Sequence, residues 1–261
     1  LTALPAVAQG QLKIVASFSI LGDMVRQVTG ELANVTTIVG PDADAHVYTP
    51  NASDAKATAN ADIIFVNGLG FETWSNTLIK TSNTKARVFV ATKGISPIKV
   101  EGEIDPHAWN ALTNGVIYVA NITEGLSQVN SKHALIYKAN AKAYSARLMA
   151  LHHRATAELK NLPERRRVVV TAHDAFGYLA NAYGLTFVAP VGIDADAEPS
   201  ANALSELINH LKKVGAGALF VENITSPVLV QQIARETGIK LGGWLFSDAL
   251  SERGGPATSY E

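Results

Sequence analysis

Three histidines and one aspartate in this 261-residue sequence combine the side chains and the positions needed to bind a transition metal. His46, His107 and His173 each lie at or beyond the end of an apolar run that is typical of a buried strand. Asp248 follows another such run, where its alternative role is to cap a short final helix. Ligands of parallel α/β sheets bind beyond the carboxyl ends of the strands. Three neutral imidazoles and one carboxylate suit a tetrahedral Zn²⁺ ion, so the sequence predicts one zinc site.

The other four histidines fall inside helical patterns, where a single histidine is usually a surface or packing residue. His152 and His153 are adjacent and therefore cannot share one face of a helix. We expect none of the four to bind the metal: His133, His152, His153 and His210.

Apolar runs alternate with helical patterns along both halves of the chain. Continuous apolar runs between helices indicate strands buried on both faces, as in a parallel sheet. The predicted strands are 12–16, 34–39, 61–66 and 87–90 in the first half, and 167–171, 185–188, 218–221 and 240–244 in the second. Each half contributes two of the four candidate ligands, so the metal is expected between two α/β lobes.

One long helix is predicted to join the lobes. Residues 126–162 contain neither Gly nor Pro and are rich in good helix formers. Ser131 is a plausible N-cap, and Pro163 ends the pattern. A helix of about 30 residues spans roughly 45 Å, which is more than a crossover needs. The predicted organisation is a lobe over 11–125, a rigid helix over 126–162 and a second lobe over 163–261.

The two lobes show signs of a common design. Three short stretches of the first half have counterparts in the second at nearly constant spacing: 13–17 with 167–171, 42–46 with 194–198, and 64–67 with 219–222. Three matches in the same order favour an internal repeat over coincidence.

The composition excludes several classes of protein. Hydrophobic residues make up 47% and charged residues 17%, as in a globular protein. The net charge of −1, without a basic stripe, makes nucleic acid and anionic membranes poor partners. Because the sequence contains no cysteine, we expect no disulfides, no thiolate zinc site and no lipid-modified cysteine anchor.

The first residues suggest export. Residues 1–8 are mostly apolar, and Ala6 and Ala8 fit an A-x-A processing site. We interpret residues 1–10 as a signal-peptide remnant with a disordered start, the alternative being a frayed apolar terminus. Export would place the protein in the periplasm, soluble and without a lipid anchor.

Five motifs surround the candidate ligands: His46-Val47-Tyr48-Thr49-Pro50 with Ser53-Asp54, Asp105-Pro106-His107-Ala108-Trp109, Thr171-Ala172-His173-Asp174-Ala175-Phe176, Phe220-Val221-Glu222, and Ser247-Asp248-Ala249-Leu250-Ser251. Through these motifs nearly the whole chain resembles the cluster A-I periplasmic zinc- and manganese-binding proteins of ABC transporters. The resemblance implies two four-stranded parallel-sheet lobes joined by one long helix.

The resemblance also implies a function. A member of that family captures a metal ion between its lobes and delivers it to an ABC permease and its ATPase in the inner membrane. A periplasmic zinc chaperone is a further candidate partner, and a monomer is expected. The matching metal ligands are His46, His107, His173 and Asp248.

The third ligand bears on the identity of the metal. Manganese-binding relatives often carry Glu at the position of His173, and Mn²⁺ prefers oxygen whereas Zn²⁺ accepts nitrogen readily. We therefore expect Zn²⁺, one per chain, with Mn²⁺ or Fe²⁺ as the alternative cargo. The chain departs from many zinc members in residues 94–105, a short loop without histidine.

A zinc hydrolase and a metal-dependent adhesin are the competing functions. Catalytic zinc usually keeps one open position for water, which four protein ligands would not leave. Glu222 and Glu198 could act as bases, but we expect Glu222 to orient a ligand and Glu198 to be a solvated loop acid. No H-E-x-x-H or G-x-S-x-G motif is present, so an enzyme is not expected.

Overall fold

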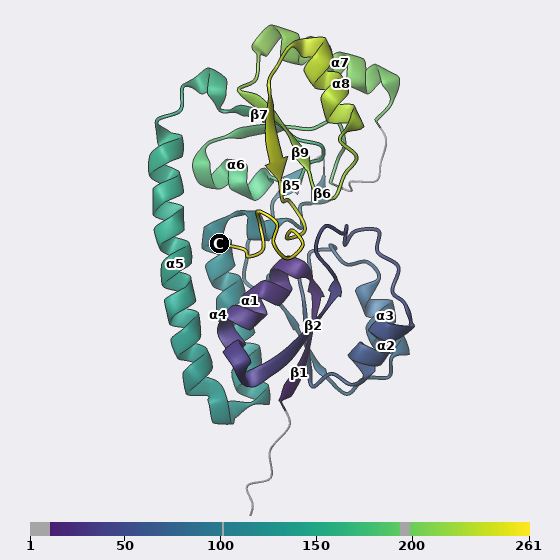
Figure 1. Ribbon diagram of the computed structural model, residues 1–261, viewed down its shortest axis with the longest axis vertical. Helices are drawn as coiled ribbons and strands as arrows, with labels where there is room; N and C mark the ends of the chain where they lie inside the picture. Colours follow the sequence, from purple (N-terminus) through teal and green to yellow (C-terminus); the bar gives the residue numbers. More distant parts are fainter. Residues whose placement is uncertain (1–10, 101, 194–198) are drawn as a thin grey trace, which may run out of the picture.

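Two four-stranded parallel sheets form the centres of two α/β lobes in the computed structural model, which describes residues 11–100, 102–193 and 199–261 (Figure 1). This arrangement confirms the predicted fold class. The first sheet has the order β2-β1-β3-β4, with all neighbours parallel. Its strands are β1 (Leu12–Phe18), β2 (Ala33–Val39), β3 (Ile63–Val66) and β4 (Arg87–Val90).

The second sheet has the order β10-β9-β7-β8, again with parallel neighbours. Its strands are β7 (Val168–Val170), β8 (Thr186–Val188), β9 (Ala218–Glu222) and β10 (Leu241–Leu245). Read from the opposite edge, this order repeats the first sheet strand for strand, so β7 corresponds to β1 and β9 to β3. These are the strands that the internal sequence matches paired. The remaining match, of 42–46 with 194–198, includes residues that lie outside the described ones.

Amphipathic helices cover the sheets. In α1, the buried side chains Leu21, Met24, Val25 and Val28 recur at helical spacing on one face. A capping box between Asn51 and Asp54 starts α2. The helices other than α5 are α1 (Ser19–Thr29), α2 (Ala52–Ala59), α3 (Ser75–Thr81), α4 (Leu112–Val129), α6 (Gly177–Tyr183), α7 (Ala201–Val214) and α8 (Val228–Thr237). No helix in the described ranges is both long and apolar enough to cross a bilayer.

The predicted long helix is α5 (Ala134–Lys160), whose 27 residues span roughly 40 Å alongside both lobes (Figure 1). Its start differs from the prediction, because residues 126–129 are the last turn of α4. Asn130 leaves the helical conformation at φ −131° and ψ 71°, and the chain then reverses through a 3-10 turn (Ser131–His133). Ser131 therefore begins this turn and does not cap α5. The composition does not indicate this break, because the helix ends at Asn130 and not at the Gly or Pro that a helix end would lead one to expect.

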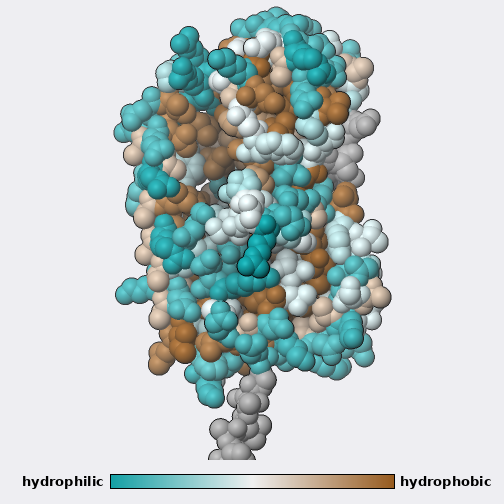
Figure 2. Space-filling view, viewed as in Figure 1, coloured by the Kyte–Doolittle hydropathy of each residue, from teal (hydrophilic) through white to brown (hydrophobic). Residues whose placement is uncertain are grey.

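The two lobes have cores of unequal size. The larger core combines the first sheet with α1, α4 and α5, and it includes the fully buried Trp109 and Tyr118. The smaller core lies around β7 and β9 and holds few large side chains, among them Ile208 and Leu211. Hydrophobic residues reach the surface of both lobes (Figure 2). In the C-terminal lobe, Trp244 is 58% exposed. The C-terminal lobe is thus the less extensively packed of the two.

The loop before Asp105 is short, as the sequence indicates, and it contains a small antiparallel hairpin. Its strands are β5 (Lys99–Val100) and β6 (Glu103–Ile104). Asp105 and His107 follow directly after the hairpin, at the junction of the lobes.

Candidate metal centre

The four predicted ligands meet in one buried cluster between the lobes. Their ligand atoms lie within 4.8 Å of one another, and each residue is buried. Asp248 Oδ2 lies 3.5 Å from His46 Nε2, 3.6 Å from His107 Nε2 and 3.2 Å from His173 Nε2. His46 Nε2 and His107 Nε2 are 3.1 Å apart. Ligands of tetrahedral zinc, at about 2.0–2.1 Å from the metal, are separated by roughly 3.3 Å, so this donor set fits a small divalent cation.

His46 and His107 are positioned by the same local device. An aspartate two residues earlier turns back so that its Oδ1 accepts the histidine backbone N–H, at 2.8 Å from Asp44 to His46 and at 2.9 Å from Asp105 to His107. Such Asx turns fix the backbone without a helix or strand. The repeated D-x-H spacing is a signal in the sequence that would have identified both aspartates, whose role sequence analysis missed.

Asp105 also orients the ring of His107. Its Oδ1 lies 2.8 Å from His107 Nδ1, and both side chains are completely buried. A carboxylate at Nδ1 places the ring proton there and leaves Nε2 to the metal. Phe71 packs against the rings of both His46 and His107, with centroids 4.6 Å and 6.0 Å away, and so limits their rotation.

His173 is oriented by Glu222, as predicted. His173 follows β7, and its Nδ1 lies 2.7 Å from Glu222 Oε2. Glu222 Oε1 accepts the backbone N–H groups of Ala172 and His173, at 2.7 Å and 3.1 Å. One buried carboxylate therefore fixes both the backbone and the ring of this ligand. Glu198, the other acid considered, lies outside the described residues.

Asp248 lies in an irregular segment after β10, and no helix follows it in the described chain, so the helix-capping alternative is wrong. Both of its carboxylate oxygens are buried, and neither has a hydrogen-bond partner among the described residues. An ionised carboxylate in this position is costly unless a cation faces it. Its surroundings supply imidazoles, which is the environment expected of a metal ligand.

The charges of the metal-free cluster are coupled. Burial disfavours the charged form of His173, but the carboxylates of Asp248 and Glu222 outweigh this and hold the pKa of His173 well above its usual value. Burial acts against His107 in the same way, and Asp248 and Asp105 raise its pKa. Burial alone would raise the pKa of Asp248, whereas His107 and His173 lower it well below its usual range. The charged forms of His107 and His173 and the ionised form of Asp248 thus favour one another.

The remaining four histidines lie elsewhere, as expected. None belongs to the cluster of metal-binding side chains found in the described part of the chain. His152 Nδ1 lies 3.1 Å from the Tyr183 hydroxyl, and His153 is exposed on α5.

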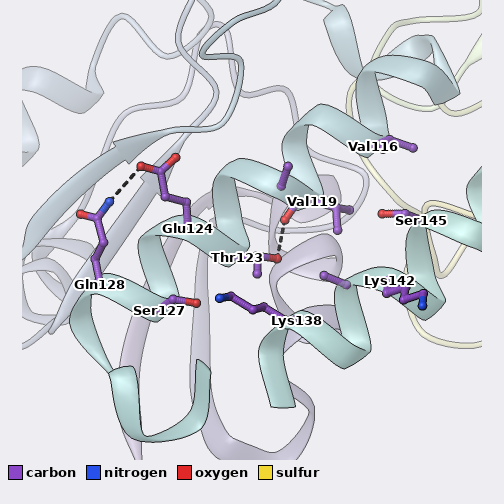
Figure 3. Close-up of a pocket in the computed structure, with 11 residues that line it drawn as sticks. Val116, Val119, Thr123, Glu124, Ser127, Gln128, Lys138, Lys142 and Ser145 are labelled. Atoms are coloured by element: carbon purple, nitrogen blue, oxygen red, sulfur yellow. Dashed lines mark hydrogen bonds between the residues drawn. The ribbon is translucent and has the colours of Figure 1, made fainter. Parts of the chain in front are cut away.

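A groove of about 550 Å³ lies between α4 and α5, away from the cluster (Figure 3). Polar residues outnumber aliphatic ones in its lining, and Lys138, Lys142 and Glu124 are the charged ones. Several polar groups there already bond to one another: Thr123 donates to the Val119 carbonyl, and Gln128 donates to Glu124. The groove brings together no set of metal ligands, so the histidine cluster is the stronger candidate for the functional site.

Glu222→Gln is expected to weaken zinc binding by about 10- to 100-fold, the usual effect of removing an outer partner of a metal ligand. The amide keeps the bonds to Ala172 and His173 but takes its negative charge away from His173 Nδ1. Chelator competition measures the affinity, with the exposed Glu206→Gln on α7 as the control. Equal affinity in both variants would show that Glu222 supports only the backbone.

Comparisons with known proteins show that the chain is similar to metal-binding components of ABC transporters. A protein-family model described as ZnuA, zinc-uptake complex component A, periplasmic, matches residues 14–261. The metal ABC transporter substrate-binding lipoprotein FimA of Streptococcus parasanguinis is 32% identical over 97% of this chain and 85% of its own length. The iron ABC transporter substrate-binding lipoprotein MtsA of Streptococcus pyogenes serotype M1 is 33% identical over 96% of this chain and 84% of its own.

Solved structures show the same fold. The periplasmic zinc binding protein TroA from Treponema pallidum superposes with a TM-score of 0.91 at 28% identity, covering 96% of this chain and 94% of TroA. A manganese-bound periplasmic metal binding protein from Candidatus Liberibacter asiaticus superposes with a TM-score of 0.87 at 30% identity, with the same coverage.

Proposed function

The chain belongs to the ZnuA family of transporter components, and from this premise we propose that it captures one Zn²⁺ ion between its lobes and delivers it to an ABC importer. The family is a substrate-binding component and not an enzyme, as the sequence predicted. The proposed ligands are His46, His107, His173 and Asp248.

The observation that carries the proposal is the composition of the cluster. Three imidazole nitrogens and one carboxylate lie within 4.8 Å of one another, and four of the pairs are 3.1–3.6 Å apart. Borderline Zn²⁺ accepts such a nitrogen-rich set, whereas harder Mn²⁺ favours oxygen. The carboxylates of Asp105 and Glu222 raise the basicity of His107 and His173, which further favours zinc.

Mn²⁺ or Fe²⁺ is the alternative cargo. MtsA is named for iron, and one structural neighbour holds manganese. Either ion would use the same four residues and the same transport role.

The proposed setting is the periplasm, where the protein acts as a monomer. The family description and the TroA structure both refer to the periplasm, which supports this placement. Relatives named as ABC transporter components support a permease and an ATPase as the partners, and a zinc chaperone is a further candidate. Residues 1–10, interpreted as a signal-peptide remnant, lie outside the described residues.

Protein purified without added metal is expected to contain about one zinc per chain, because one cluster of ligands is present in the described residues. Mass spectrometry measures the metal content, and excess manganese is then offered in competition. Retention of zinc supports the proposal, with the exposed His153→Ala as a control that should behave like the parent. Tight manganese or iron occupancy would change the cargo, and a protein that binds no metal under any condition would overturn the proposal.

A further inference from the structure

We infer that Asp248 moves with the N-terminal lobe, so that His46, His107 and Asp248 form a three-ligand half-site from which His173 separates when the metal is exchanged. This inference rests on the proposed metal site. It concerns the way residues 247–261, called here the C-terminal segment, return from β10 to the first lobe (Figure 1).

The backbone on both sides of Asp248 is bonded to the N-terminal lobe. The Trp109 indole N–H donates to the Ser247 carbonyl at 2.7 Å, in a fully buried contact. The Leu250 N–H donates to Ser19 Oγ at 3.0 Å. The Leu250 carbonyl accepts the Asp42 N–H at 2.9 Å. The chain is therefore bonded to the N-terminal lobe one residue before Asp248 and two residues after it.

The rest of the C-terminal segment continues along the same lobe. The Tyr260 N–H donates to Asp23 Oδ2 at 3.0 Å, and the Tyr260 hydroxyl donates to the Trp109 carbonyl. Glu261 pairs with Arg147 of α5 at 2.8 Å. Leu250 and Tyr260 pack with the larger core and not with the core of the C-terminal lobe.

His173 is held by the other lobe. Its backbone N–H is bonded to Glu222 of β9, and it forms an isolated parallel bridge with Val191. The next residue, Asp174, donates its N–H to the Gly192 carbonyl at 3.1 Å. The backbone bonds of Ala172, His173 and Asp174 thus stay within the C-terminal lobe.

Two sets of bonds cross between the lobes near these ligands. On the His173 side, Asn110 Nδ2 donates to the Ala175 carbonyl at 2.8 Å, and the Tyr178 hydroxyl donates to the Asp105 carbonyl at 3.0 Å. On the Asp248 side, Asn223 Nδ2 donates to Asp42 Oδ1 at 2.8 Å and to the Ala249 carbonyl at 3.2 Å. A shift of the C-terminal lobe would strain these bonds. The bonds that join Ser247 and Leu250 to the N-terminal lobe would stay intact.

The half-site predicts the order in which the ligands leave the metal, with His173 first. When His173 leaves, three ligands still hold the ion and one coordination position opens toward the C-terminal lobe. An open fourth position is the arrangement in which zinc exchanges ligands with an incoming donor. The metal would therefore be handed over from the N-terminal lobe.

Zinc affinity in a double-mutant cycle tests this order. Ser19→Ala removes the acceptor of the Leu250 N–H, and Tyr260→Phe removes the bond to Trp109. Asn110→Ala removes a bond on the His173 side. Each change is measured by chelator competition in the parent and in His173→Ala. Ser205→Ala, on the exposed face of α7, is the matched control.

Ser19→Ala and Tyr260→Phe are the two anchor variants. Each is expected to weaken zinc binding roughly tenfold in the parent and by a similar factor in His173→Ala, because both act on the half-site. Asn110→Ala should weaken binding in the parent and have no effect in His173→Ala. The opposite pattern, in which Asn110→Ala acts in both backgrounds and the anchors act in neither, would show that Asp248 moves with the C-terminal lobe. Absorption spectra of Co²⁺ bound to the anchor variants should report altered coordination, which a loss of overall stability alone would not produce.

Spin-label distances give an independent readout, since the chain has no native cysteine to interfere. Cysteines replace three exposed residues: Lys56 on α2, Arg235 on α8 and Arg253 in the C-terminal segment. The 56–253 distance should be equal with and without zinc, while the 235–253 distance changes. A change confined to the 56–253 pair, or no change in either pair, would contradict the inference. If the parent protein binds no metal, the proposed function fails; if it binds metal and the anchors are neutral, only this inference fails.

Discussion

His107→Ala is expected to reduce zinc affinity by more than about 100-fold, beyond the range typical of outer partners of a metal site. His107 is completely buried, and its Nε2 lies 3.1 Å from His46 Nε2 and 3.6 Å from Asp248 Oδ2. Truncation removes one of four donors and leaves Asp105 buried without its imidazole. The void cannot collapse easily, because Phe71 and Trp109 pack against this ring from the surrounding core.

Chelator competition measures this loss, and thermal unfolding of the metal-free protein shows whether the variant still folds. His153→Ala is the matched control, since it removes an exposed histidine from α5. If both variants bound zinc equally well, His107 would not be a ligand and the assignment of the cluster would be wrong.

Zinc affinity is also expected to fall steeply as the pH is lowered, starting above pH 6.5. Zinc binds the deprotonated imidazoles, while Asp248 and its neighbours raise the pKa of His173 and of His107 in the metal-free protein. Each proton displaced costs about tenfold in affinity per pH unit below the pKa of the group. Affinity should therefore fall by up to about 100-fold per pH unit where both rings are protonated in the metal-free protein.

The contribution of His107 and His173 to the stability of the metal-free protein should rise as the pH is lowered, whereas zinc affinity falls. A histidine whose pKa is raised by folding stabilises the protein fully below its unfolded value of about 6.5, and this contribution is lost as the pH rises through the folded value. The lowered pKa of Asp248 contributes stability above about pH 3.9, which is lost as the pH falls through its folded value. The difference in Tm between zinc-bound and metal-free protein should consequently widen from pH 6 to pH 8.

Calorimetry in buffers of different ionisation enthalpy counts the protons released on binding. Glu222→Gln provides an internal check, because losing one of the carboxylates that raise the pKa of His173 should move the onset of the pH dependence downward. Zinc affinity that is constant between pH 6 and pH 8 would contradict the coupling described for the metal-free cluster.

The meeting of the four candidate ligands could be predicted because most of them follow the ends of strands. His46, His173 and Asp248 come shortly after β2, β7 and β10, where parallel sheets expose their carboxyl ends. Glu222, at the end of β9, was predicted for the same reason. These strand ends come together because the two sheets pack into one molecule. Apolar periodicity indicates the fold class but not the details of this packing.

Two features escaped the sequence analysis for different physical reasons. The break at Asn130 depends on how α4 and α5 pack, because local propensity is favourable to helix on both sides of it. The anchoring of Asp248 depends on pairings with Ser19 and Asp42 that are more than 200 residues distant along the chain. Neither motif nor spacing can indicate such a partner in a single sequence, although the D-x-H repeat before two of the ligands could have been noticed.

The return of the C-terminal segment also affects how the chain must fold. The N-terminal lobe includes Leu250 and Tyr260 in its core, so the first lobe cannot be completed until those residues are available. The C-terminal lobe is in effect inserted between two parts of its neighbour and can form its own sheet from a continuous stretch of chain. Contacts between residues so far apart close large loops and slow the search for the native state. The second lobe should therefore gain its structure before the first is sealed, which makes closure of the metal site one of the last events of folding.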